Sequence, residues 1–472
     1  MHGTTRARLP ILAVGWLALL AGRHCHCVRA IARWRCPSDV APRPQVRPSH
    51  TCLVPTARVL SAPAIETVQR RSVRTLIGSQ MLGGLGVASG IAVSSLMAAQ
   101  ILGSPDLAGL ANTAQVMGAA LLSIPAARLM AARGRRAGLV TAYLTGTIGA
   151  GLAIAAAVLS SFPLLLVATS LFGASTTANN QARYAATDLA APDRRGRALS
   201  VVVWATTLGA VLGPNLVAPA GRLAGAWGLP PLSGAFLFSM AGFLLAATLL
   251  LVRMRPDPLL TARQVAVDAG HTERTHGSVR RGLRVIRQHP LAMLGLGAVA
   301  VGHTVMVSVM VMTPLHMDHG GAELRLIGLV ISVHVFGMYA FSPVMGWLVD
   351  RVGGRLVVIG GAATLLAASL VSSRAPEGWS DGLVLGLFLL GLGWSATLVA
   401  GSTLLTSAVA QHERPGVQGA SDLVMGLCAG LGGGLSGVVV GEWGYTTLCL
   451  IAATLSVALG LRTLAFRSPQ LT

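Results

Sequence analysis

The chain has 472 residues, of which 53% are hydrophobic and only 11% are charged, and its formal net charge is +20. Soluble domains carry roughly 25% charged residues, so this composition excludes an ordinary soluble domain and indicates a membrane protein. The positive charge is carried wholly by arginine. These arginines punctuate apolar spans and form no basic face interleaved with aromatic residues, which argues against nucleic-acid binding.

The first 70 residues differ from the rest of the chain. They begin with a charged and then apolar stretch typical of a signal peptide, but no clear small-residue cleavage site follows. The region is rich in arginine and almost free of acidic residues, which would also suit an organelle transit peptide. Its four cysteines have a spacing that fits no closed zinc site. We expect residues 1–70 to be a disordered or transit-like extension, or to lie upstream of the true translation start.

Apolar spans fill the rest of the chain. Windows of about 20 residues, the length needed to cross roughly 30 Å of hydrocarbon, identify twelve of them. They run over residues 76–101, 107–130, 137–160, 163–189, 198–220, 232–252, 291–315, 326–348, 356–373, 382–404, 417–440 and 444–464. The sequence thus predicts an all-α polytopic membrane protein with six spans in residues 71–253, a basic linker in residues 254–290 and six spans in residues 291–472.

Arginine is concentrated in alternate loops between these spans. The loops on the other side carry only Arg222, Arg325 and Arg374. Positively charged short loops stay on the cytoplasmic side of a membrane. We therefore expect both ends of the twelve-helix core to face the cytoplasm, with the basic linker on the same side, in a bacterial plasma membrane.

One loop pattern occurs twice, once in each half. The stretch SPVMGWLVDRVGGRLVVIG covers residues 342–360, and SIPAARLMAARGRRAGLV covers residues 123–140. Both lie between the second and third spans of their half and share a spacing of glycine and arginine, but Ala131 stands where the second copy has Asp350. The repeat indicates a duplicated six-helix unit with parallel halves, which is a known transporter plan.

At these loops the chain resembles the major facilitator superfamily, whose signature there is G-x-L-x-D-R-x-G-R followed by basic residues. The matching residues are Gly346, Leu348, Asp350, Arg351, Gly353 and Arg355 in the second half, and Leu129, Gly134, Arg135 and Arg136 in the first. The resemblance implies the major facilitator fold, with 12 transmembrane helices in two six-helix bundles. It also implies that each loop latches helix ends through charge pairs and helix dipoles. We expect the first latch, which lacks the aspartate, to be weakened or rebuilt; a plain solvated turn is the alternative for each copy.

The fifth span contains a second match to the superfamily, to its antiporter signature. Gly209, Gly213 and Pro214 reproduce the G-x-x-x-G-P core, although Ala218 and Pro219 replace the closing glycines. Glycines four residues apart allow close helix packing, and proline bends a helix. Such a bend would suit two bundles that rock against each other. Ordinary packing of small residues is the alternative interpretation.

The fourth span is the richest in polar residues. Thr176, Asn180 and Arg183 recur at helical spacing on one face, with Tyr184 beside them. We expect this face to line a central substrate cavity. Arg183 lies near the cytoplasmic end, where Asp188 is a candidate partner in a gate contact. Substrate or proton chemistry and plain snorkelling are the alternative roles of Arg183.

The eleventh span contains Asp422, the only acidic residue well inside a span of the second half. Ionisable residues within spans usually line a water-filled path or pair with each other. Asp422 is therefore a candidate for proton coupling. It is equally placed to form an ion pair with Arg183 or with the first-half loop arginines when the cytoplasmic side closes, and we favour this gate.

The seventh and eighth spans carry one histidine each, His303 and His334, near mid-depth. Histidine protonates near neutral pH, so two at similar depth are candidates for a proton relay, although satisfied structural histidines are the alternative. Met306 and Met310 would add a soft, adaptable cavity lining, unless they only fill the core.

No catalytic, cofactor or metal motif stands out, and a chain without lysine cannot form the phosphate loop of an ATPase. The resemblance implies a secondary transporter that works by alternating access, not an enzyme. Its expected partners are the lipid bilayer, a small-molecule substrate and protons, and it is expected to work as a monomer. The leading interpretation is proton-coupled efflux of small apolar or amphipathic compounds, as in the drug:proton antiporter branch. The alternatives are a proton-coupled importer of a small polar or anionic nutrient and a non-transporting membrane sensor.

Overall fold

The computed structural model describes residues 62–103, 107, 109–270 and 277–466, and among these it contains helices and loops but no strand. The predictions for residues 1–61 lie outside the described residues, whereas residues 62–70 form the first turns of a helix. The elements are α1 (Ala62–Leu102), α2 (Gly109–Arg133), α3 (Arg135–Val158), α4 (Phe162–Ala185), η2 (Pro192–Arg194), α5 (Arg195–Asn215), α6 (Val217–Ala226), α7 (Ser233–Arg253), α8 (Pro258–Asp268), α9 (Val279–Gln288), α10 (Pro290–His319), α11 (Leu324–Tyr339), α12 (Ser342–Val352), α13 (Gly354–Ser373), α14 (Asp381–Ser407) and α15 (Arg414–Leu464).

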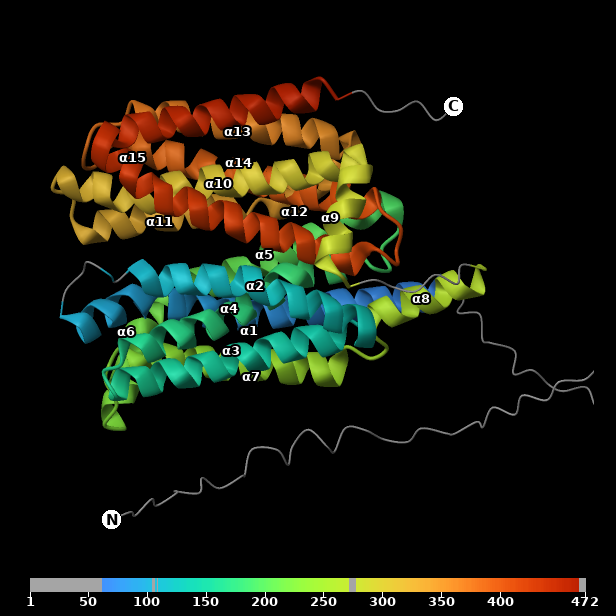
Figure 1. The fold of residues 1–472 in the computed structure, drawn as a ribbon, viewed down its shortest axis with the longest axis horizontal. Helices are drawn as coiled ribbons and strands as arrows, with labels where there is room; N and C mark the ends of the chain where they lie inside the picture. The colour runs from blue at the N-terminus through green and yellow to red at the C-terminus, as the bar shows by residue number, and fades with distance from the viewer. Residues whose placement is uncertain (1–61, 104–106, 108, 271–276, 467–472) are drawn as a thin grey trace, which may run out of the picture. The chain divides into compact units, whose positions relative to one another are not determined.

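The predicted all-α membrane architecture is confirmed. Among the described residues, ten helical segments are long and apolar enough to cross a membrane. The polar fourth span, α4, is not one of the ten, but its 24 residues are enough to cross the bilayer. One of the ten, α15, has 51 residues and a non-helical backbone at Gly444, and Figure 1 shows that it folds back on itself. Counting α4 and both arms of α15 gives the twelve predicted spans.

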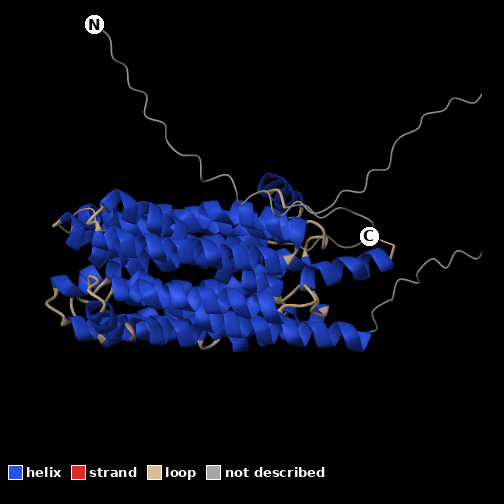
Figure 2. Cartoon of the chain, turned by 90° about the horizontal axis from the view of Figure 1, so that it is seen from below, coloured by secondary structure: helices blue, strands red, loops and turns tan. Residues whose placement is uncertain are grey.

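The long helices run roughly parallel to one another (Figure 2) and bury two main apolar clusters. One cluster is built from α1 to α5 and α7, and its largest members include Phe172, Phe236 and Phe243. The other is built from α10 to α15, joined by Leu199 and Val203 of α5. Helices approach closely within each bundle because glycines leave room for the neighbouring backbone.

The loops after α2, α4, α12 and α14 lie at one end of the molecule together with α8 and α9 (Figure 1). This end, which carries most of the arginines, is called the arginine-rich end below. Asp257 caps α8 by accepting hydrogen bonds from the backbone N–H groups of Leu259 (3.0 Å) and Leu260 (3.2 Å). Basic α9 buries Val279 and Ile286 and leaves its arginines exposed. The predicted basic linker thus contains two short helices.

Candidate functional site

A buried ion pair joins the two bundles near the arginine-rich end. The Arg183 guanidinium, near the end of α4, donates a hydrogen bond to Asp422 Oδ1 of α15 over 2.9 Å, and both side chains are 3% exposed. Gln181 Nε2 donates to the other carboxylate oxygen of Asp422 over 2.7 Å. Both oxygens of this intramembrane carboxylate are therefore occupied by partners from the opposite bundle. The structure brings together two residues that the sequence analysis considered as partners.

A second buried ion pair lies beside the first. Arg135, at the start of α3, contacts Asp188 through two hydrogen bonds, Nε to Oδ2 over 2.7 Å and one terminal nitrogen to Oδ1 over 3.0 Å. Both side chains are 0% exposed. Asp188 thus pairs with Arg135, and its predicted pairing with Arg183 was wrong. The reason is geometric, because α4 ends at Ala185 and the chain then turns Asp188 towards α3.

Two glutamines connect these ion pairs into one network. Gln181 accepts a hydrogen bond from Arg135 over 3.2 Å and donates to Asp422. Gln418 of α15 accepts from Arg135 over 2.6 Å and so forms a second bridge between the bundles. The interbundle network, as we call it, comprises Arg135, Gln181, Arg183, Asp188, Gln418 and Asp422. Its two arginines and two carboxylates cancel in formal charge, as buried charges require.

The face of α4 around Arg183 was predicted to line a cavity. Asn180 Oδ1 accepts a hydrogen bond from Arg183 over 3.1 Å. The Arg183 guanidinium lies 4.7 Å from the centre of the Tyr184 ring, and the Tyr184 hydroxyl donates to Ser421 across the bundle boundary over 3.3 Å. Thr176 is half-buried, and its hydroxyl has no hydrogen-bond partner among the described residues.

An aromatic cluster lies in the second bundle. Trp394 of α14 donates from Nε1 to His303 Nδ1 over 2.8 Å, and the Tyr339 ring meets the Trp394 ring edge-on at 5.5 Å. His303, Tyr339 and Trp394 thus form an aromatic cluster with polar tips inside the second bundle.

The two histidines proposed as a relay each bond to α14. His303 accepts from Trp394, whereas His334 is fully buried and its Nδ1 lies 2.8 Å from the Leu387 carbonyl oxygen. In the described part of the chain no hydrogen bond joins the two histidines, and His334 Nε2 has no partner. Met306 and Met310 pack on the apolar cluster of the second bundle.

The second-half loop motif holds α12 against α5. Asp350 accepts hydrogen bonds from the backbone N–H groups of Gly196 (2.8 Å) and Arg197 (3.0 Å) in the first turn of α5. A carboxylate at a helix N-terminus is favoured by the helix dipole. Gly346 makes this approach possible, because a Cβ there would lie 2.0 Å from Ser200 Oγ.

The remaining members of this motif stay within the second bundle. Gly353 has a positive φ of 89° and joins α12 to α13. Arg351 lies over the Trp347 ring, 5.2 Å from its centre. Arg355 donates to the carbonyl oxygens of Thr463 and Leu464 at the end of α15, over 2.9 and 2.8 Å.

The first-half loop is built differently around its missing aspartate. Gly134 has a φ of 88° and separates α2 from α3. The backbone N–H of Arg136 donates to Asp257 over 2.7 Å, and the Ala131 carbonyl accepts from Arg263 of α8. Arg135 is part of the interbundle network. The hydrogen bonds of this loop are therefore made with α15 and with the start and middle of α8, and not with an aspartate of the loop itself.

The antiporter-type motif packs α5 on α1 inside the first bundle. A Cβ at Gly209 would lie 2.4 Å from the backbone nitrogen of Leu85, and one at Gly213 would lie 2.6 Å from Ala88 Cβ. The helix ends one residue after Pro214, at Asn215, and α6 begins at Val217. The break lies in the predicted fifth span, but the close glycine contacts are with α1 and not with the second bundle.

Sequence reasoning missed four residues of this site, namely Gln181, Gln418, Tyr339 and Trp394. Aromatic residues are only 4% of the chain, so a tyrosine and a tryptophan within spans were a usable signal. The glutamines gave no such signal, because their importance arises only from partners far away in sequence. No cluster of three or more metal-ligating side chains occurs in the described part of the chain.

Comparison with known proteins gives consistent matches along the chain. A family model described as Major Facilitator Superfamily matches residues 76–325 and 306–471. The chain is 37% identical over 398 residues to the MFS-type transporter YddS of Bacillus subtilis, covering 83% of this chain and 89% of that protein. It is 28% identical over 360 residues to the riboflavin transporter RfnT of Brucella anthropi, covering 76% of this chain and 86% of the relative. Among solved structures, the human organic anion transporter MFSD10 shares the fold with a TM-score of 0.65 at 16% identity, covering 84% of this chain and 99% of that one.

Proposed function

The chain belongs to the major facilitator superfamily, and from that premise we propose that it exports small apolar or amphipathic compounds in exchange for protons. It is an integral membrane transporter of a small molecule, and its relatives are transporters and not enzymes. Export in exchange for protons would assign it to the drug:proton antiporter branch. Alternating access would expose the site between the bundles first to one side of the membrane and then to the other.

The observation that carries this proposal is the Arg183–Asp422 ion pair. It crosses from one bundle to the other within the membrane, and both side chains are almost fully buried. A proton on Asp422 would remove the negative charge that faces Arg183 and would weaken the bridge. Proton binding would then be linked to the opening of the arginine-rich end. In this scheme Asp422 binds the coupling proton, and its ion pair with Arg183 keeps the arginine-rich end closed.

Further features bear on the direction of transport and on the membrane in which the protein works. The match of the α5 glycines to the antiporter signature favours export, and Met306 and Met310, which pack on the apolar cluster of the second bundle, would suit varied apolar ligands if that region lines the substrate path. The arginine-rich end would face the cytoplasm of a bacterial plasma membrane, because positive loops stay inside and YddS is bacterial. We further propose that the protein works as a monomer.

Import of a flat, partly polar nutrient is the second candidate. The second bundle carries the aromatic cluster of His303, Tyr339 and Trp394, and such a surface suits a planar ring. The relative RfnT is described as a riboflavin transporter. In this alternative Arg183 and Asn180 would contact the substrate directly, and the ion pair with Asp422 would open when substrate binds.

Cellular accumulation separates the two candidates. The full chain would be expressed in a bacterium that lacks its own efflux pumps, and retention of a fluorescent lipophilic cation would be followed before and after the proton gradient is collapsed. Export predicts low retention that returns to the vector control on collapse, and it predicts that Asp422→Asn abolishes the difference while the exposed control Glu442→Gln retains it. His334→Ala tests the alternative that His334, and not Asp422, binds the coupling proton, in which case this variant should lose export.

Unchanged retention across a broad dye panel, with the protein present in the membrane, would contradict export. Uptake of labelled riboflavin above the vector control, lost in Arg183→Gln, would then establish the import candidate.

A further inference from the structure

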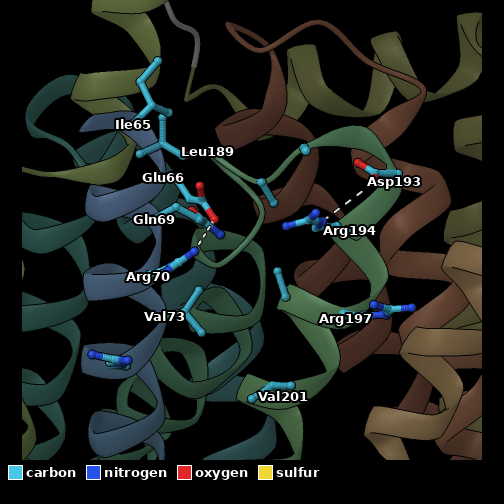
Figure 3. A pocket seen from close by; sticks show the side chains of 14 residues that line it. Ile65, Glu66, Gln69, Arg70, Val73, Leu189, Asp193, Arg194, Arg197 and Val201 are labelled. Atoms are coloured by element: carbon cyan, nitrogen blue, oxygen red, sulfur yellow. Dashed lines mark hydrogen bonds and ion pairs between the residues drawn. The ribbon is translucent and has the colours of Figure 1, made fainter. Parts of the chain in front are cut away.

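A cavity of about 740 Å³ opens at the arginine-rich end, and no member of the interbundle network lines it. It lies between the first turns of α1, the loop that follows α4, and the first turns of α5. Figure 3 shows side chains from all three segments around it. We call it the α1–α5 cavity. Neither the transport cycle proposed above nor the loop motifs assign it a role.

The charged side chains of the cavity are mainly arginines. Four arginines and two carboxylates line it, which gives a formal charge of four minus two, or +2; they are Arg70, Arg74, Arg194, Arg197, Glu66 and Asp193. Glu66 is occupied by Arg70 at 2.6 Å. Arg194 is only loosely held by Asp193, at 3.8 Å, and Arg74 is exposed and has no partner among the described residues. Two guanidinium groups are thus available to an anion.

The rest of the lining is apolar and reaches deeper into the molecule. Both α1 and α5 run from the arginine-rich end into apolar spans, so Val73 and Val201 mark the membrane side of the cavity. Ile65 and Leu189 lie nearer its outer end (Figure 3). Since α1 has 41 residues and only about 20 are needed to cross the hydrocarbon, its first turns reach the level of the lipid headgroups.

One buried polar atom in the lining also lacks a partner. Gln69 donates from Nε2 to the Ala186 carbonyl oxygen over 2.6 Å, but its Oε1 is buried and has no hydrogen-bond donor among the described residues. This atom is covered by protein, so a ligand in the cavity does not reach it, and Gln69 serves to hold α1 against the loop after α4.

We propose that the α1–α5 cavity binds the phosphate headgroup of an acidic phospholipid. Its phosphate would contact Arg74 and Arg194, and the start of an acyl chain would lie on Val73 and Val201. Arginine is well suited to phosphate because its planar guanidinium donates two parallel hydrogen bonds. This site is independent of substrate identity and of transport direction.

Native mass spectrometry of the full chain in detergent tests the proposal. The protein would be titrated with phosphatidylglycerol or with phosphatidylcholine of the same acyl chains. Each surface arginine contributes about 1 kcal/mol towards anionic lipid, so Arg74→Gln/Arg194→Gln, which removes two, should bind phosphatidylglycerol roughly thirtyfold more weakly, with phosphatidylcholine unchanged. The control Arg222→Gln/Arg325→Gln removes the same charge from exposed positions at the opposite end and should behave as wild type.

Three results would overturn the assignment. The first is equal binding of phosphatidylglycerol by the cavity variant and by wild type, with equal unfolding temperatures to show that both are folded. The second is displacement of the lipid by glycerol phosphate at equal concentration, which would make the cavity a site for a soluble phosphate compound. The third is an equal loss of binding in the opposite-end control, which would show that the loss follows from net charge and not from the cavity.

Discussion

At the scale of single residues, the cost of burying charge explains the arrangement of the interbundle network. Arg135 and Asp188 are both 0% exposed, and Arg183 and Asp422 are 3% exposed. An unpaired charge at such depth is expensive, whereas a neutralised pair with further hydrogen bonds is tolerated. The glutamine bridges supply those further bonds. Loss of any single partner should therefore cost more than the pair itself contributes.

The first prediction concerns Arg135. Its replacement in Arg135→Gln leaves Asp188 charged and buried without its partner, so the free energy of unfolding should fall by roughly 3–5 kcal/mol. The control Arg133→Gln removes an exposed arginine two residues earlier and should change stability by less than about 0.5 kcal/mol. Chemical or thermal unfolding in detergent measures both. Equal stability of the two variants would contradict the buried pairing.

The second prediction is a double-mutant cycle across the bundle boundary. Asp422→Asn and Arg183→Gln should each lower the free energy of unfolding by roughly 3–5 kcal/mol, because each leaves one buried charge unpaired. The double variant leaves neither charge and should lose clearly less than the two single losses added together. Asp381→Asn, at an exposed position on α14, serves as the control. Strictly additive losses would mean that the two side chains do not interact.

At the scale of helices, small residues decide how closely the bundles approach. Gly346 of α12 faces Ser200 and the carbonyl oxygen of Gly196 in α5, and a Cβ there would lie 2.0 and 2.5 Å from them. Distances this short require the helices to move apart. The Asp350 contact with the first turn of α5 depends on the same approach.

The third prediction follows from this contact. Gly346→Ala should push α12 away from α5 and shift the protein towards the conformation that is open at the arginine-rich end. Gly360→Ala on α13 is the control, because a Cβ there meets nothing within 4 Å. Labelling of Ser200→Cys with a soluble thiol reagent reports the opening, since Ser200 is fully buried. Unchanged labelling in Gly346→Ala would show that this contact does not hold the end closed.

The helices also show what could be predicted from sequence and what could not. The predicted spans matched the observed helices because hydropathy over about 20 residues reports directly on burial in lipid. Their lengths were less well predicted, since α1 begins at Ala62 and not near residue 76. Its first polar turns are stabilised by contacts such as Gln69 with Ala186, which no window of hydropathy contains.

The site was predictable only in part for a related reason. A charged residue inside a span is conspicuous by itself, so Arg183 and Asp422 could be found. Pairing depends on helix ends and on the register between distant helices. Asp188 was assigned to the wrong arginine because the end of α4 was expected four residues later than Ala185.

At the scale of the whole molecule, the distribution of contacts between the bundles defines the conformation. Among the residues that the structure describes, the hydrogen bonds that join the two bundles all lie near the arginine-rich end. The described conformation is therefore held together at that end. Opening there requires the interbundle network and the Asp350 contact to break together.

The fourth prediction concerns orientation in the membrane. In a background without the native cysteines, Arg351→Cys at the arginine-rich end and Arg374→Cys at the other end are both at exposed positions. A membrane-impermeant thiol reagent should label Arg374→Cys in intact bacteria and Arg351→Cys only in inverted vesicles, because positive loops stay cytoplasmic. The reverse pattern would contradict the proposed orientation, because the arginine-rich end would then face away from the cytoplasm.

The measurement that tests the gate most directly is the distance between the bundles at the arginine-rich end. Spin labels at Arg133→Cys on α2 and Arg351→Cys on α12, in the same cysteine-free background, allow it to be measured by pulsed electron paramagnetic resonance. Wild type should give a predominant short distance, and Asp422→Asn should populate a longer one, while Glu442→Gln should match wild type. An unchanged distance distribution in Asp422→Asn would contradict the assignment of the Arg183–Asp422 pair as the gate.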